Sequence, residues 1–218
     1  MQRGSCVWKR AFAAKDGRQA GSVAATKRIR QSTLERTERD GDGMNSVRAL
    51  IATAWEARRE GRHAEGERDL QQAITEARES GSRVDLVHAL KALAHVWRDM
   101  DRSEHALSLY EEAVALSREA DDGLLLAHTV RHLGDLHRET GRTADAAHCY
   151  REALSLYGAA ADPPPLDVAN TLRPAAILKE AEGDTEAAQQ FWTEARRLYQ
   201  LAGVPQGVRE CERRLGLR

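Results

Sequence analysis

AHTVRHLGDLHRETGRTADAAHCYREALSLY, residues 127–157, is one of four related stretches that make up most of the chain. The four stretches are Ser46–Glu79, Leu86–Ala120, Ala127–Tyr157 and Val168–Leu201. A turn divides each stretch in two; these turns fall at Gly61, Asp101, Gly141 and Gly183, which are 40, 40 and 42 residues apart. A fixed period between about 20 and 50 residues is typical of stacked repeats. The spacing therefore predicts a repeat architecture.

Two positions of the repeat carry only small side chains. Counted from Val47, Val87, Ala127 and Ala169, the eighth residues are Ala54, Ala94, Gly134 and Ala176, and the twentieth are Gly66, Ala106, Ala146 and Ala188. Two helices joined by a short turn pack closely only where neither carries a bulky side chain at the crossing. Larger residues surround these positions at helical spacing, among them Tyr110, Tyr150 and Trp192 at the twenty-fourth position. Each unit is therefore expected to be a helical hairpin.

This arrangement resembles the tetratricopeptide repeat, in which small residues at positions 8, 20 and 27 alternate with larger and aromatic residues. The third unit matches its signature best, with Leu133-Gly134, Ala146, Tyr150 and Ala153. The second unit follows with Leu93-Ala94, Trp97, Ala106, Tyr110 and Ala113. The long period resembles the variety found in kinesin light chain and in many bacterial regulators. The first unit departs from the signature at Thr53 and Ala57, and the fourth at Pro174.

The resemblance implies an all-α, right-handed α-solenoid of four helical hairpins with a C-terminal capping helix, acting as a protein-interaction module. The expected hairpins are residues 46–80, 83–120, 123–157 and 166–202, and the expected cap is residues 204–217. Polar residues before the helices predict N-caps at Asn45 or Ser46, at Ser103 and at Asp184. Pro163–Pro165 are expected to form an extended loop, and Pro174 to bend its helix unless that helix begins later.

Residues 1–43 lie outside the repeats and form a basic segment, with ten Lys or Arg against five Asp or Glu. Since the segment has scattered Gly, Ser and Gln and few periodic apolar residues, we expect a disordered tail. Two interpretations stay open. The tail is functional, or Met44 is the true start and the upstream residues are an addition.

Composition excludes several classes of protein. Ala, Leu, Arg and Glu dominate, and no alternating β-branched run competes with helix. The three cysteines, Cys6, Cys149 and Cys211, are odd in number and far apart, which indicates a reducing compartment. There is no apolar run of 18 residues and no signal-type segment. We therefore expect a soluble, cytoplasmic protein without a membrane partner.

The first helix of each hairpin is expected to line a concave inner face, on which positions 2, 5, 9 and 12 lie together. These sixteen positions hold seven cations and two acids, whereas residues 44–218 as a whole hold 23 basic and 29 acidic residues. The predicted ligand-binding residues are Arg48, Trp55, Arg58, His88, Lys91, His95, Arg98, His128, Arg131, Arg138, Asn170 and Arg173. A concave surface of one sign attracts the opposite charge. The inner face therefore predicts an acidic peptide or a C-terminal segment as partner.

Alternatives to this interpretation remain. The arginines can instead pair with acids of neighbouring helices and have no further role. His128 and His132 have the spacing of a two-histidine metal site, with Asp135 and His95 as conceivable further ligands. The basic tail could attract nucleic acid, although the repeats lack regular aromatic platforms. Because the chain holds no recognisable catalytic or phosphate-binding motif, we expect neither enzyme activity nor a metal or cofactor. Only Lys91 and Arg131 resemble the basic members of the carboxylate clamp known in some tetratricopeptide domains.

Overall fold

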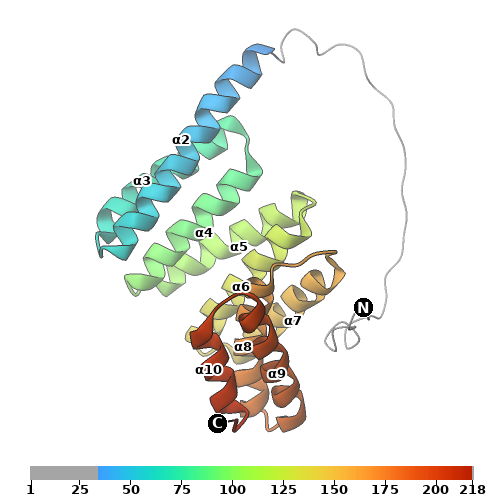
Figure 1. Cartoon of the computed structure of the whole chain (residues 1–218). Helices are drawn as coiled ribbons and strands as arrows, with labels where there is room; N and C mark the ends of the chain where they lie inside the picture. Colours follow the sequence, from blue (N-terminus) through green and yellow to red (C-terminus); the bar gives the residue numbers. More distant parts are fainter. Residues whose placement is uncertain (1–33, 218) are drawn as a thin grey trace. The chain divides into compact units, whose positions relative to one another are not determined.

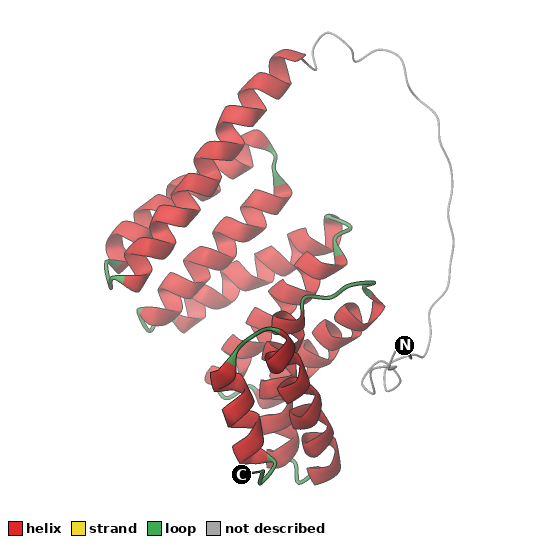
Figure 2. Cartoon of the chain, viewed as in Figure 1, coloured by secondary structure: helices red, strands yellow, loops and turns green. Residues whose placement is uncertain are grey.

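The structure, a computed structural model, describes residues 34–217, and every regular element within them is a helix (Figure 2). The helices are α2 (Leu34–Arg59), α3 (His63–Ser80), α4 (Arg83–Asp99), α5 (Ser103–Glu119), α6 (Gly123–Glu139), α7 (Thr143–Ala159), α8 (Pro165–Ala181), α9 (Thr185–Leu201) and α10 (Pro205–Arg214). Consecutive helices pair as hairpins, as α6 does with α7 and α8 with α9 (Figure 1). The all-α prediction and the order of the hairpins are confirmed.

The first helix begins earlier than predicted. Helix α2 starts at Leu34 and runs through Asn45 and Ser46, so neither is an N-cap. The helix forms despite Gly41 and Gly43, which cost about 1 kcal/mol each relative to Ala. The prediction of a disordered tail therefore does not hold for residues 34–43, and residues 1–33 lie outside the described part of the chain.

Local side-chain caps set several other helix starts. Asp184 precedes α9 and accepts from the Ala187 N–H at 3.2 Å, as predicted. Ser82 and Asp122 cap α4 and α6 in the same way. The prediction for Ser103 is wrong. That residue is the first helical residue of α5, because the Ala106 N–H already donates to the Arg102 carbonyl.

The described residues divide into two compact units, one of residues 34–116 and one of residues 117–217. In the first, α2 packs against α3, and α3 against α4. In the second, α6 to α9 form two hairpins, and α10 packs on α9. All eight predicted small residues are buried, as are Tyr110, Tyr150 and Trp192. The register of the repeat is therefore confirmed in both units.

The spacing of small residues follows from how closely the helices approach. A Cβ added at Gly66 would lie 3.2 Å from the carbonyl oxygen of Ala54 on the paired helix. At Gly134, it would lie 2.9 Å from Cε1 of Tyr150 and 3.0 Å from Cβ of Cys149. Contacts below 3.0 Å force a neighbour to move. Gly134 is therefore fixed by its helix partner.

Most of the helices are followed by a residue whose backbone adopts the left-handed conformation, with positive φ. Glycines with positive φ lie at 61, 81, 141, 183, 203 and 216, and aspartates do so at 101 and 121. From 61 to 141 these residues recur every 20 residues, at the turn within each hairpin and at the turn between hairpins. The exception is the loop that leads into Pro165, where Pro164 and Pro165 direct the chain into α8 instead. The predicted turn positions are confirmed.

Replacing Asp101 with glycine should raise the free energy of unfolding by up to about 1 kcal/mol, because glycine avoids the Cβ strain of φ 58°. The matched control is Gly141→Ala at the equivalent turn, where φ is 76°. That change should lower the free energy by about 1 kcal/mol, since it introduces the strain. Urea titration followed by circular dichroism measures both. Equal effects of the two changes would contradict this account of the turns.

Helix α8 contains Pro174 in its interior and is nevertheless one continuous helix from Pro165 to Ala181. It begins at the start of the predicted register, with Pro165 in its first turn, where the missing N–H has no helical partner. Pro174 is buried.

Candidate functional site

In the first unit, two of the predicted arginines are tied to acids on the next inner helix. Arg48 Nε donates to Asp85 Oδ1 at 3.2 Å, and Arg58 Nε donates to Asp99 Oδ2 at 2.6 Å. These pairs join α2 to α4. They correspond to the alternative in which the basic side chains neutralise neighbouring acids.

Aromatic rings of the same unit also contact one another. The ring of Trp55 lies 5.4 Å from that of His95, which in turn lies 5.8 Å from Tyr110. The Arg58 guanidinium lies 5.2 Å from the Trp55 ring centroid, a distance typical of cation–π contact. Arg98 Nη1 is 3.4 Å from His95 Nδ1. Four of the predicted residues therefore contact one another in this unit.

Two predicted residues, Lys91 and Arg131, are largely buried. Lys91 is 5% exposed and Arg131 is 8% exposed. Arg131 donates to Asp135 Oδ2 at 2.8 Å and lies 2.6 Å from His132 Nε2. The Asp135 carboxylate also accepts from the Tyr150 hydroxyl at 2.9 Å. Reversing the charge of Lys91 or Arg131 would therefore disrupt the packed interior as well as any surface site.

In the second unit, α8 is connected to α9 and α10 through two predicted residues. Arg173 Nε donates to Glu210 Oε2 at 2.8 Å, and Asn170 Oδ1 accepts from the Tyr199 hydroxyl at 2.9 Å. Arg214 also pairs with Glu180, at 2.9 Å. These contacts hold α10 against α8 and α9, as expected of a capping helix.

Four predicted residues meet at one hollow in the second unit. Arg131, Arg138, Asn170 and Arg173 line a cavity of about 240 Å³ between α6 and α8. The same cavity is lined by Asp135, Glu139, Pro174 and Ile177. We call it the inner hollow. Its lining is mostly polar, and it lies on the face that the repeat register predicts for ligand binding.

Two guanidinium groups of the inner hollow retain unused hydrogen-bond donors. The Nε atoms of Arg131 and Arg138 are buried and have no hydrogen-bond partner. Arg138 faces Glu139 only loosely, with Nη2 3.7 Å from Oε1. An unsatisfied buried donor costs about 1–3 kcal/mol, so an acceptor that enters the hollow is favoured.

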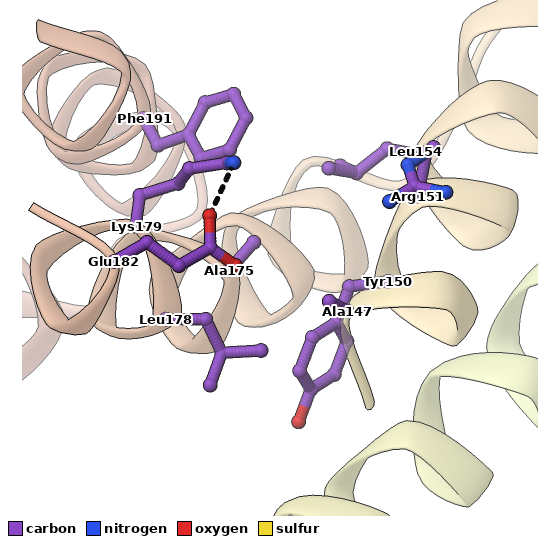
Figure 3. A pocket seen from close by; sticks show the side chains of 9 residues that line it. All are labelled: Ala147, Tyr150, Arg151, Leu154, Ala175, Leu178, Lys179, Glu182 and Phe191. Carbon is purple, nitrogen blue, oxygen red and sulfur yellow. Dashed lines mark hydrogen bonds and ion pairs between the residues drawn. The ribbon is translucent and has the colours of Figure 1, made fainter. Parts of the chain in front are cut away.

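A second, smaller pocket lies among α7, α8 and α9, and Figure 3 shows the side chains around it. Its volume is about 80 Å³, and Tyr150, Leu154, Leu178 and Phe191 form its apolar wall. The Lys179 ammonium and the Glu182 carboxylate pair at 2.6 Å at its edge (Figure 3). The repeat register does not predict this pocket, because the predicted ligand-binding positions all lie on the first helix of each hairpin, whereas α7 and α9 are second helices.

A ladder of ion pairs on the second helices was also missed. Arg78 pairs with Glu112 at 2.7 Å in the first unit, and Arg118 pairs with Glu152 at 2.9 Å in the second. Each arginine precedes its partner by 34 residues. The repeat itself indicates these pairs, because the two arginines occupy equivalent positions in successive repeats and so do the two glutamates. At the next step of the ladder, Gly158 replaces the arginine.

The remaining predicted residues are not among those that line the inner hollow. His128 contacts His132, with ring centroids 4.6 Å apart, and His88 lies on α4 in the first unit. Among residues 34–217, no group of three or more His, Cys, Asp or Glu is arranged to hold a metal ion. No described helix is long and apolar enough to cross a membrane.

The comparisons with known proteins agree with this fold. Residues 85–159 match the family model of the tetratricopeptide repeat. BtubC (BKLC) from P. vanneervenii has a similar structure over 83% of this chain and 89% of its own, with 18% identity and a TM-score of 0.57. A putative kinesin light chain with nearly identical TPR-like repeats, from Podosopora anserina, is similar over 78% of this chain and 92% of its own, with 15% identity and a TM-score of 0.51. None of the curated proteins matches the sequence.

Proposed function

We propose that this chain is a tetratricopeptide-repeat protein of the long-period, kinesin light chain-like kind, because residues 85–159 match the family model and the fold is similar to that of such repeats. Such repeats are in general protein-interaction modules, without chemistry of their own. We propose that this one binds an acidic peptide or C-terminal segment of a protein on its basic inner face. Recognition takes place in the cytoplasm, where the buried free thiols of Cys149 and Cys211 stay reduced.

The inner hollow carries this proposal. Three arginines and one asparagine converge there against two acids. Two of the arginines keep a buried Nε without a partner. A carboxylate accepts charge-assisted hydrogen bonds from guanidinium groups more strongly than neutral acceptors do. The hollow therefore favours a ligand with a negative charge.

The ion pairs elsewhere on the inner face limit where the ligand binds. Arg48, Arg58 and Arg173 already face Asp85, Asp99 and Glu210. Ion pairs near the surface contribute about 0–1 kcal/mol and weaken with salt, so a ligand can compete for such arginines but gains little from them. Arg138 lies 3.7 Å from its nearest acid, Glu139, farther than these three arginines lie from theirs. We therefore place the main contact at Arg138.

Fluorescence anisotropy with a labelled octapeptide of alternating Asp and Gly tests the proposal. The wild-type chain should bind the peptide with an affinity that falls as salt rises from 50 to 500 mM. Arg138→Glu should weaken binding about tenfold or more. The matched control is Arg151→Glu, an exposed arginine of α7 that lines the other pocket, and it should change the affinity less than about twofold.

Two comparisons make the result specific. A peptide of alternating Lys and Gly should not bind, and a free C-terminus should be compared with an amidated one to locate the preferred carboxylate. Thermal melts of both variants check that the fold persists. The proposal fails if the wild-type chain ignores the acidic peptide, or if Arg151→Glu weakens binding as much as Arg138→Glu.

A further inference from the structure

The pocket among α7, α8 and α9, which we call the apolar pocket, lies where the fourth hairpin departs from the repeat signature. At the seventh position of the repeat, Leu93 and Leu133 in the second and third hairpins become Ala175 in the fourth. At the eleventh position, Trp97 of the second hairpin becomes Lys179. Ala175 and Lys179 both line the pocket. The cavity therefore lies where smaller or polar residues replace two large apolar side chains of the repeat.

Trp97 shows what fills the equivalent space in the first unit. It lies on α4, and its indole N–H donates to Glu67 Oε1 on α3 at 2.9 Å. Its ring lies 5.7 Å from that of His105 on α5. One large side chain thus contacts both the helix before α4 and the helix after it. Glu67 and Ala147 occupy equivalent positions of their repeats, and Ala147 lines the apolar pocket. A side chain from another molecule can therefore take the place that Trp97 takes in the second hairpin.

The apolar pocket has the size and the lining for one aliphatic side chain. Its volume is about 80 Å³, and Leu154, Leu178 and Phe191 form its wall together with the ring of Tyr150. An apolar cavity of about 150 Å³ holds benzene, so roughly half that volume suits a leucine side chain better than an indole. Because Tyr150, Leu154 and Leu178 are almost fully buried, the surrounding helices hold this wall in place. Transfer of an aliphatic side chain from water into such a pocket is favourable.

The charges at the rim of the pocket differ between its two sides (Figure 3). On α8, the Lys179 ammonium lies 2.6 Å from a Glu182 oxygen and 3.7 Å from an Asp184 oxygen, so its charge is already matched. On α7, Arg151 is exposed, and within residues 34–217 it forms no ion pair. The hydrogen bond to Glu182 raises the pKa of Lys179, and the nearby positive charge of Arg151 opposes this rise. An acid placed beside the pocket therefore gains most at Arg151.

We propose that the apolar pocket is a docking site for a partner protein, which inserts one leucine side chain and places an acidic residue next to Arg151. This site is additional to the inner hollow, because the two cavities share no lining residue. The octapeptide of Asp and Gly has no side chain to insert, and a single exposed ion pair contributes little by itself. Arg151→Glu therefore remains a valid control for binding at the inner hollow.

Two blocked octapeptides, built mostly of Gly and Ser, test the docking site. One carries Leu and Asp separated by one Gly, and the other carries Lys in place of the Asp. NMR spectra of the full chain with labelled leucine methyl groups follow the titrations, because Leu154 and Leu178 line the pocket and show where binding occurs. Leu172 is buried and does not line the pocket, so its methyl groups are the internal control.

The peptide with Leu and Asp should shift the methyl resonances of Leu154 and Leu178 and leave those of Leu172 unchanged. Replacing its Leu with Ala should weaken binding about tenfold or more, because most of the buried apolar surface is lost. Arg151→Glu should weaken binding about fivefold and reverse the preference, so that the peptide with Lys binds better. The matched control is Arg209→Glu, at an exposed arginine of α10, which should change the affinity less than about twofold.

Ala175→Leu restores the residue type that the second and third hairpins carry at this position, and it should fill the pocket. The peptide should then no longer shift the resonances of Leu154 and Leu178. The melting temperature of this variant should equal or exceed that of the wild-type chain, since filling a cavity buries more apolar surface. Arg151→Glu lies at the surface and tests the site independently of this change in packing.

Three results contradict the proposal. They are unchanged resonances of the two pocket leucines, equally tight binding by Ala175→Leu and the wild-type chain, and equal affinity of the wild-type chain for the peptides with Asp and with Lys. Two further results would assign the pocket to another occupant. Shifts of the same resonances on dilution of the chain alone would indicate a second copy, and shifts on deletion of residues 1–33 would indicate that segment.

Discussion

Replacing Tyr150 with alanine should lower the free energy of unfolding by about 3–5 kcal/mol, the range for removing a large aromatic side chain from a packed core. Tyr150 is 1% exposed, and its ring lies where a Cβ on Gly134 would clash. Its hydroxyl donates to Asp135. Truncation therefore leaves a cavity between α6 and α7 and leaves the Asp135 carboxylate with one donor fewer. Chemical unfolding monitored by circular dichroism measures the loss.

Tyr150→Phe is the matched control, because it keeps the ring and removes only the hydroxyl. It should cost about 1–2 kcal/mol, consistent with the loss of a hydrogen bond to a charged acceptor. It should also weaken peptide binding in the inner hollow a few-fold, since Asp135 lines the hollow and would present a less compensated negative charge. A phenylalanine variant as unstable as the alanine variant would show that the hydroxyl, rather than the packing of the ring, dominates.

The hairpins were predictable because close packing restricts the residue types at a few positions. Gly66 and Gly134 carry no Cβ because the paired helix occupies that space, and a sequence period reveals such a restriction directly. The start of α2 was not predictable in the same way. Gly41 and Gly43 disfavour helix, whereas the charged residues before them favour it. Because these two helix propensities are of comparable size, the sequence alone does not determine where the helix begins.

The inner face was predictable as a set of positions but not as a set of contacts. The register correctly assigned Arg131, Arg138, Asn170 and Arg173 to one side of their helices, and they line one hollow. It could not show that Arg173 pairs with Glu210, because the offset between stacked helices decides which acid meets which arginine. Arg48 and Asp85 are 37 residues apart, whereas Arg58 and Asp99 are 41 apart, although both pairs join the same two helices.

At Pro174, the prediction from the sequence and the structure differ. In the sequence it is a departure from the repeat signature and predicts a bend. In the structure it lies buried in a continuous helix, at the edge of the hollow that its neighbours line.

Gly207→Val should detach α10 from the second unit and lower the free energy of unfolding by about 1–3 kcal/mol, or more if the helix cannot shift. A Cβ at this position would lie 2.5–2.7 Å from three ring atoms of Tyr199. The ring cannot turn aside without cost, because it is buried and its hydroxyl is bonded to Asn170. The capping helix must therefore move, and the ion pair between Arg173 and Glu210 should break with it.

The thiol of Cys211 reports this movement directly. It is 0% exposed, and burial is the main cause that raises its pKa to about 11. Relative to a thiol of pKa 9.0, that shift lowers the thiolate fraction on the order of 100-fold near pH 8, which slows reaction with a disulfide reagent. In a Cys6→Ser background, Gly207→Val should speed the modification of Cys211 at least tenfold. Cys149, whose pKa burial raises to about 12, should stay slow in α7.

Gln206→Ala is the control for α10, since Gln206 is exposed beside Gly207 and its removal should leave the rate of Cys211 modification unchanged. If α10 is a cap that also fixes the hollow, Gly207→Val should reduce peptide affinity too, because Tyr199 orients Asn170 and Asn170 lines the hollow. If Cys211 is modified fast in the valine variant while the peptide affinity stays at the wild-type value, α10 contributes to the stability of the fold but not to peptide binding. Slow modification in the valine variant would contradict the packing of α10 on α9.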